Sequence, residues 1–184
     1  MKNPPAELAR QLLDASDAVL HGDPPPRLED VARLVGSSRA TLYYYFSGRD
    51  DLLTFLLTAH AKAGAEAVRS QVRSDDAPPA RLRAMVGAMV TYLGEHPGTC
   101  AGLLGALGSA GRMNDVLAAN DTWVAGPLRE LLAEFTVDGA ADAANAIMGA
   151  ILLAVLGRSM AGEDPTDPAF RQRLTEQVVR GVLA

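Results

Sequence analysis

Apolar residues recur at helical spacing along most of the chain, and no stretch alternates apolar and polar residues as a half-buried strand would. The first helical run follows Pro4 and Pro5, and the proline-rich stretch 21–26 ends it. Turn residues divide the rest of the chain in the same way. We therefore expect an all-α protein of about nine helices, at residues 6–20, 27–35, 39–45, 50–72, 80–95, 98–108, 112–136, 139–161 and 167–183.

The pattern divides the chain into two parts that a long helix joins. Short helices and tight turns fill residues 1–49, whereas longer helices fill residues 50–184. Asp50 and Asp51 open the joining helix, where acidic groups suit the positive end of the helix dipole. We expect an N-terminal three-helix domain and a larger C-terminal helical domain, in which Pro127 kinks its helix.

Composition indicates a globular protein with a sizeable core, because 48% of the 184 residues are apolar. Cys100 is the single cysteine, so an internal disulfide is impossible. The first residues lack the apolar stretch of a signal peptide, which predicts a cytoplasmic protein. The most apolar run, 140–157, contains Asp142 and Asn145 and falls short of the roughly 20 residues of a membrane span. We expect a buried helix there and no membrane partner.

Residues 28–45 have the features of a helix-turn-helix. Ala32 is small where two helices must cross closely, and Gly36 permits a positive φ in the turn. The apolar residues that join the two helices are Val31, Val35 and Leu42. The residues left outward on the second helix are Arg39, Ala40, Tyr43 and Tyr44. This outward face suits a major groove of DNA.

The residues from Leu28 to Leu53 carry a family resemblance. The stretch that ends at Leu53 reads LEDVARLVGSSRATLYYYFSGRDDLL, and it resembles the DNA-binding signature of the tetracycline-repressor (TetR-type) family of transcriptional regulators. Its most specific part is the run 41–46, followed by the basic Arg49 and an acid-Leu-Leu helix start. The motif resemblance covers about residues 6–58, and beyond it only the length and the helical layout are similar.

The resemblance implies which residues contact a double-stranded DNA operator. In the family, the recognition helix reads bases with its early residues and holds phosphates with its aromatic residues. The residues at matching positions are Arg27, Ser38, Arg39, Thr41, Tyr43, Tyr44, Tyr45 and Arg49. Arg39 is the one long donor on the helix and suits a two-point contact with guanine. Arg27 stands where the family usually has a capping Thr or Ser, and Ser37 where the turn residue is usually apolar.

The net charge of −5 opposes DNA binding through bulk electrostatics. Residues 1–50 contain six basic and seven acidic residues, so the predicted reading domain is nearly neutral. Affinity must therefore come from a few placed cations, helix N-termini and hydroxyls. The three successive tyrosines 43–45 cannot all point inward on a helix, so at least one is exposed and available for DNA.

The resemblance also implies a small-molecule effector in the second domain. Met85, Met89 and Tyr92 share one helix face, and soft side chains such as methionine suit an adaptable apolar pocket. The residues expected to line this pocket are Met85, Met89, Tyr92, Leu104, Met113, Trp123, Phe135, Met148 and Leu152. An ordinary core position explains any one of them equally well.

The last two predicted helices have apolar faces broader than packing on one side requires. In the family these helices pair with their copies in a four-helix bundle, which implies a homodimer. The residues expected at the dimer interface are Ile147, Ile151, Val155, Leu174, Val178 and Val182. The alternative is that they form the core of a monomer.

Motifs for metal binding and catalysis are absent from the sequence. His21, His60 and His96 are too far apart for a metal motif, and there is neither an H-E-x-x-H nor a G-x-S-x-G pattern. We expect no cofactor and no enzymatic activity. The resemblance implies a ligand-responsive regulator, most simply a repressor that a small apolar or amphipathic ligand releases from a palindromic operator. The alternatives are a helical small-molecule-binding protein that has lost DNA binding, and a small-molecule enzyme.

Overall fold

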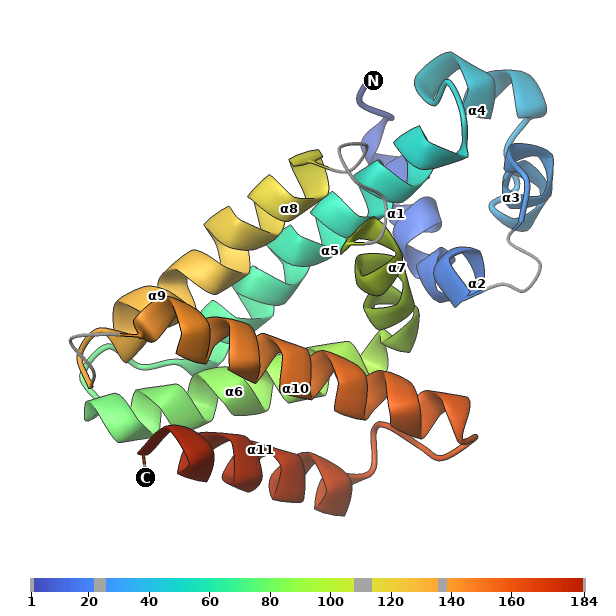
Figure 1. Ribbon diagram of the computed structural model, residues 1–184. Helices are drawn as coiled ribbons and strands as arrows, with labels where there is room; N and C mark the ends of the chain where they lie inside the picture. Colours follow the sequence, from blue (N-terminus) through green and yellow to red (C-terminus); the bar gives the residue numbers. More distant parts are fainter. Residues whose placement is uncertain (1, 22–25, 108–113, 136–138, 184) are drawn as a thin grey trace.

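The structure, a computed structural model, describes residues 2–21, 26–107, 114–135 and 139–183, and all regular elements in these ranges are helical (Figure 1). The prediction of an all-α fold is confirmed. In chain order the elements are α1 (Ala6–Asp14), α2 (Ser16–His21), α3 (Leu28–Leu34), α4 (Arg39–Tyr45), α5 (Arg49–Gln71), α6 (Pro78–Glu95), α7 (Pro97–Leu107), α8 (Asn114–Asn120), η1 (Asp121–Ala125), α9 (Gly126–Leu132), α10 (Ala140–Met160) and α11 (Pro168–Leu183).

Two predicted helices are interrupted. The one expected at 6–20 divides at Ala15 into α1 and α2. The one expected at 112–136 contains α8, the π-helical turn η1 and α9. This turn ends two residues before Pro127, and the N–H of Gly126, the residue that follows the turn, bonds to the carbonyl of Asp121 five residues earlier. Because proline lacks an N–H, the irregularity expected at Pro127 takes the form of this wider turn.

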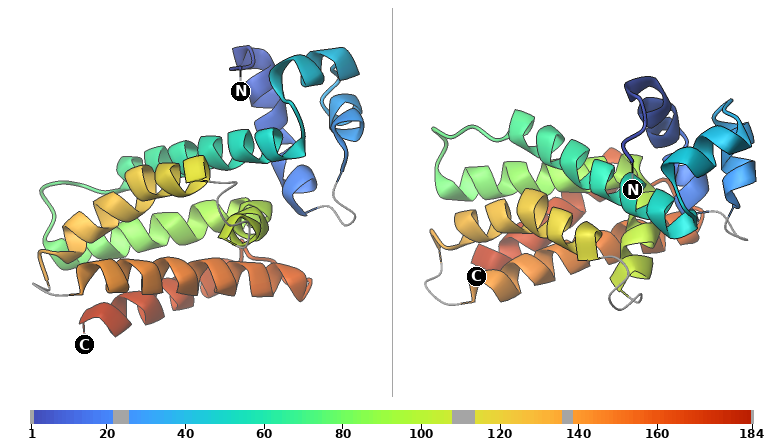
Figure 2. Two further views of the ribbon diagram at one scale, coloured as in Figure 1. Left: turned by 45° about the horizontal axis from the view of Figure 1, so that its top comes forward. Right: turned by 90° about the horizontal axis from the view of Figure 1, so that it is seen from above.

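Helix α5 connects the two ends of the molecule. Figures 1 and 2 show α1 to α4 gathered around its first turns, while α6 and α8 lie along its remaining length and α10 and α11 form the far layer. The 23 residues of α5 give a rod of about 35 Å. Helix α5 therefore contributes to both ends of the molecule.

Two hydrophobic cores meet along α5. The first core unites apolar side chains of α1 to α4 with Leu52, Leu56 and Leu57 of α5, and Ala106 and Val116 close it from α7 and α8. The second core unites α6, α9, α10 and α11, with Val68 near the end of α5. The first core thus extends past the predicted boundary after residue 49, because the start of α5 packs against the N-terminal helices.

Helix α7 approaches α2 closely because two glycines leave room. A Cβ on Gly98 would lie 2.7 Å from the Asp17 carboxylate, and one on Gly102 would lie 2.8 Å from Leu57 and 3.0 Å from Leu20. The Gly98 N–H also donates to the Asp17 carboxylate at 2.8 Å. The N-terminal helices are therefore fixed against the larger helical body at α2 as well as through α5.

The residues predicted at the dimer interface lie in α10 and α11, in or beside the second core. Four of the six residues expected to meet a second copy are buried in the second core, and two are partly buried against it; they are Ile147, Ile151, Val155, Leu174, Val178 and Val182. Four of the six residues thus belong to the chain's own core, and Val178 and Val182 pack against it while remaining partly exposed. The opposite face of α10 is also apolar, with Leu153 60% and Met160 74% exposed. Periodicity could not separate two apolar faces.

The same helix is long and apolar enough to cross a membrane by length and composition, a test that core helices of globular proteins also pass. Only 22% of its most apolar stretch is buried. The buried helix expected at 140–157 is therefore buried on one face alone.

Candidate DNA-binding face and ligand cavity

The turn between α3 and α4 has the predicted geometry. Gly36 has a φ of 65°, the left-handed region that glycine adopts freely. The Ser37 N–H donates to the carbonyl of Ala32 at 2.8 Å, which closes the end of α3. Ala32 and Leu42 are buried where the two helices meet. The outward side of α4 is consequently held at a fixed angle to α3.

Ser38 and Thr41 fix the start of α4. Ser38 precedes the helix, and its hydroxyl accepts a hydrogen bond from the Thr41 N–H at 3.0 Å, as an N-cap does. The two hydroxyls also bond to each other at 2.7 Å. Ser38 is exposed and Thr41 half-buried, so both predicted contact residues lie at the solvent-facing start of α4.

Arg39 and Tyr43 share a partner that the sequence did not reveal. A guanidinium nitrogen of Arg39 lies 3.2 Å from a carboxylate oxygen of Glu29, and the Tyr43 hydroxyl donates to the same oxygen at 3.0 Å. Hydrogen bonds from its own backbone N–H and from Tyr43 lower the pKa of Glu29. The Arg39 guanidinium also lies 5.3 Å from the centre of the Tyr43 ring. Glu29 therefore orients both residues on the outward face.

The three tyrosines divide as the helical geometry requires. Tyr43 and Tyr44 are exposed, whereas Tyr45 is half-buried and packs against the first core. The rings of Tyr44 and Tyr45 meet edge to face at 5.0 Å. The Lys2 ammonium lies 3.8 Å from the centre of the Tyr44 ring, which places an unforeseen cation beside α4.

Arg27 and Arg49 flank the helix-turn-helix at exposed positions. The Arg27 side chain does not cap the first turn of α3; the Asp30 carboxylate accepts from the Arg27 N–H at 3.1 Å, and the Asp30 N–H bonds to the Arg27 carbonyl at 2.9 Å. Arg49 is the first residue of α5. The turn before it is held by Asp51, which accepts from the Ser47 hydroxyl and N–H, and these bonds lower the pKa of Asp51.

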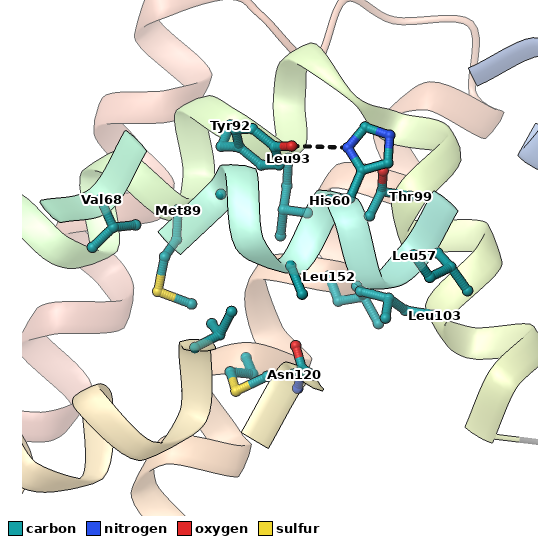
Figure 3. A pocket seen from close by; sticks show the side chains of 14 residues that line it. Leu57, His60, Val68, Met89, Tyr92, Leu93, Thr99, Leu103, Asn120 and Leu152 are labelled. Atoms are coloured by element: carbon teal, nitrogen blue, oxygen red, sulfur yellow. Dashed lines mark hydrogen bonds between the residues drawn. The ribbon is translucent and has the colours of Figure 1, made fainter. Parts of the chain in front are cut away.

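A cavity of about 70 Å³ lies between α5, α6, α7, α8, η1 and α10 (Figure 3). Four of the predicted ligand-binding residues line it, namely Met89, Tyr92, Met148 and Leu152. The lining residues that sequence reasoning missed are Leu57, His60, Ala61, Gly64, Val68, Leu93, Thr99, Leu103, Asn120 and Val124. Half of these belong to one face of α5, where Ala61 and Gly64 are small enough to leave space.

The other predicted pocket residues lie elsewhere. Met85 and Phe135 pack against the second core, and Leu104 is half-buried away from the cavity. Trp123 is 38% exposed, because Val124, its neighbour in η1, is the residue that faces inward. Met113 lies outside the described residues.

An outer groove of about 400 Å³ adjoins the cavity. The residues common to both are Leu103, Asn120, Met148 and Leu152. The groove continues between α8, η1 and α10, past Leu117, Asn145 and Gly149. Only side chains therefore separate the small inner cavity from a larger open space.

His60 connects the cavity wall to the N-terminal helices. Its Nδ1 lies 2.8 Å from the Tyr92 hydroxyl, as drawn in Figure 3, and its Nε2 lies 2.7 Å from the hydroxyl of the buried Ser16 in α2. Burial, with a smaller contribution from His96, lowers the pKa of His60 to about 4. Burial likewise raises the pKa of Tyr92. This wall of the cavity is therefore polar but uncharged at neutral pH.

No protein-family model and no curated protein matches the chain, whereas solved structures match it over almost its full length. The fatty acid degradation regulator FadR from Bacillus halodurans superposes with a TM-score of 0.76 at 22% identity, covering 97% of each chain. A TetR-like transcriptional regulator from Rhodococcus sp. RHA1 gives 0.73 at 22% identity, covering 98% of each. FadR from Bacillus subtilis, solved in complex with stearoyl-CoA, gives 0.71 at 18% identity, covering 94% of this chain and 98% of that one. The chain therefore has the fold of the TetR-like transcriptional regulators.

Proposed function

We propose that the protein is a ligand-responsive DNA-binding transcriptional regulator, most simply a cytoplasmic repressor that binds a palindromic operator as a homodimer. The observation that carries this proposal is the outward face of α4, where Arg39, Tyr43 and Tyr44 are exposed on a helix anchored by the buried Leu42. Large exposed aromatics on a short, rigidly held helix suit a DNA groove better than water. The fold shared with known regulators supports the same function.

Each exposed group on this face has a role in the proposed complex. Arg39 reads guanine in the major groove, with Ser38 and Thr41 beside it at the start of α4. The residues proposed to contact phosphates or thymine methyl groups are Lys2, Arg27, Tyr43, Tyr44, Tyr45 and Arg49. Residues 1–49 act as the reading unit, and residues 50–184 act as the ligand-binding and dimerisation unit.

The exposed face of α10 is the surface proposed to meet a second copy. Its exposed residues include a stripe at successive spacings of four, three, four and three: Ala146, Ala150, Leu153, Gly157 and Met160. This is the heptad spacing with which two helices pack together, and its small members allow close approach. This stripe replaces the six residues that the sequence suggested for the interface.

Ligand release is proposed to act through α5. One face of α5 lines the cavity, and its first turns belong to the core of the reading unit. Two recognition helices in one dimer must lie about 34–36 Å apart to enter successive major grooves. A ligand that binds better to another position of α5 shifts this spacing and weakens the complex.

The proposal is tested by titrating the full chain against DNA from upstream of its own coding sequence over a series of salt concentrations. We expect a specific complex, at least a thousandfold tighter than with shuffled DNA of the same composition. Absence of a specific complex at low salt would contradict the proposal. It would favour the alternative of a ligand-binding protein without DNA binding, which the net charge of −5 also supports.

A further inference from the structure

The inner cavity contains one buried polar atom without a partner. Thr99, near the start of α7, is 3% exposed and lines the cavity, and its Oγ1 makes no hydrogen bond within the part of the chain that the structure describes. A buried hydroxyl left without a partner is unfavourable, and such groups are rare in native proteins. The Thr99 hydroxyl is therefore available to bond to a molecule in the cavity.

A second polar group in the cavity keeps one bonding position free. His60 is bonded at both ring nitrogens, one of them to the Tyr92 hydroxyl. Because a neutral imidazole has one donor and one acceptor, Tyr92 either gives its proton to His60 and keeps a lone pair, or accepts from His60 and keeps its proton. Tyr92 thus offers a second hydrogen-bonding position in the lining that also contains Thr99.

The residues that line the inner cavity disfavour a charged group inside it. Among its described residues there is no Lys, Arg, Asp or Glu. A buried carboxylate or phosphate without a cationic partner is strongly unfavourable. The cavity is consequently unsuited to the charged end of a fatty acid or an acyl-CoA, although one structure of the same fold contains stearoyl-CoA.

The shape of the space limits the ligand further. The cavity of about 70 Å³ is roughly half the size of an engineered apolar cavity, about 150 Å³, that admits benzene. An unbranched chain is narrower than a ring. Such a chain can continue past Met148 and Leu152 into the outer groove, which offers about 400 Å³.

We infer that the effector is an uncharged, unbranched molecule with one small polar end, such as an alcohol, an aldehyde or a methyl ketone. The polar end bonds to Thr99 and Tyr92 in the inner cavity, and the chain passes between Met148 and Leu152 into the outer groove. This inference rests on the proposed function only in naming the molecule an effector, because its binding to the free protein can be measured without DNA.

The test uses 1-octanol and octanoate as probes, titrated calorimetrically into the full chain at pH 7.5. We expect 1-octanol to bind at least tenfold more tightly than octanoate. Thr99→Val removes the hydroxyl with little change of shape and should weaken 1-octanol about tenfold, because the buried alcohol loses a partner. Its melting temperature should be unchanged or higher, since an unpartnered hydroxyl has been removed.

Thr58→Val is the matched control. The Thr58 hydroxyl is also buried without a partner among the described residues, but Thr58 does not line the cavity. This variant should bind 1-octanol like the parent chain. Equal binding of 1-octanol by the parent and Thr99→Val would overturn the role of Thr99, and octanoate binding as tightly as 1-octanol would overturn the requirement for an uncharged ligand.

The route of the chain is tested at Gly149, which lines the outer groove. A Cβ built there meets no atom within 4 Å, so the backbone accommodates a side chain, and Gly149→Leu is expected to place its side chain in the groove. This variant should weaken 1-octanol at least fivefold, and unchanged affinity would overturn the route. If neither probe binds while the chain still forms its specific DNA complex, the ligand assignment fails and the proposed function stands. If 1-octanol binds as expected but no specific DNA complex forms, the ligand assignment stands and the proposed regulator function fails.

Discussion

Helices α4 and α10 differ in whether their buried and exposed faces have different chemistry. Only Leu42 of α4 is buried, and the exposed side carries Arg39 and two tyrosines, so the inward and outward faces differ in chemistry. Helix α10 has 21 residues and carries apolar side chains on its exposed face as well as on its buried face, with Leu153 and Met160 opposite the buried face. Sequence patterns place a helix correctly where its two faces differ, and they leave its rotation undecided where both faces are apolar.

The largest expected effect tests whether α4 is anchored by its buried side. Phe46, directly after α4, is fully buried, so Phe46→Ala should lower the free energy of unfolding by about 4 kcal/mol. Tyr44 is 61% exposed, so Tyr44→Ala should change it by less than about 0.5 kcal/mol while weakening operator binding. Urea denaturation measures both. Similar stability losses in the two variants would show that this division of α4 is wrong.

The next effect tests the exposed side of α10. Leu153→Glu places a charge in the apolar stripe, so we expect a monomer with unchanged helix content and operator affinity about a hundredfold lower, because the two half-sites are no longer bound together. Sedimentation equilibrium and fluorescence anisotropy measure these changes. Ala80→Glu adds the same charge at an exposed position of α6 and is the control. A dimeric Leu153→Glu protein would exclude this face as the interface.

The buried polar wall of the cavity gives a smaller, pH-dependent effect. The pKa of His60 is lowered to about 4, whereas a histidine in the unfolded chain has a pKa of about 6.5. Between these values the unfolded state binds more protons, so the native state loses stability as the pH falls. From pH 7 to pH 5 we expect a loss of about 2 kcal/mol, and His60→Gln should lack this component. An equal pH dependence in the two proteins would contradict the assignment.

The smallest effects separate the proposed roles of Arg39 in α4 and Arg49 at the start of α5. Consider the difference in binding free energy between the operator and an operator variant in which another base replaces the contacted guanine. Arg39→Ala should reduce this difference by about 1.5 kcal/mol. Arg49→Ala should weaken all DNA sequences alike and lower the salt dependence by about one phosphate contact. Competition binding at several salt concentrations measures both. If the two variants lose the same amount on every sequence, Arg39 does not read a base.

Most of the reading unit could be predicted from the sequence because its constraints are local. Gly36 in the turn, Ala32 at the crossing and the buried Leu42 follow from short-range spacing. Glu29 and Lys2 could not be predicted, because their contacts with Tyr43 and Tyr44 depend on how separate segments pack. The two residues that the sequence did not indicate, Glu29 and Lys2, are thus those whose contacts join separate segments of the chain.

The cavity was predicted only in part for a similar reason. Met89 and Met148 are large apolar residues of the kind that suggests a pocket, and they line it. Gly64 and Ala61 create the space by being small, and Thr99 is notable only because none of the described residues bonds to its hydroxyl. Absence of volume and absence of a partner are properties of the packed structure, so composition and periodicity do not show them.

The most direct test of the regulator proposal is a footprint of the full chain on DNA flanking its own coding sequence. We expect a protected, palindromic region whose half-sites lie about one helical turn apart, or a multiple of it, and we expect Arg39→Ala to need about tenfold more protein for the same protection. Protection that is independent of sequence, or no protection at low salt, would contradict the claim that α4 reads an operator.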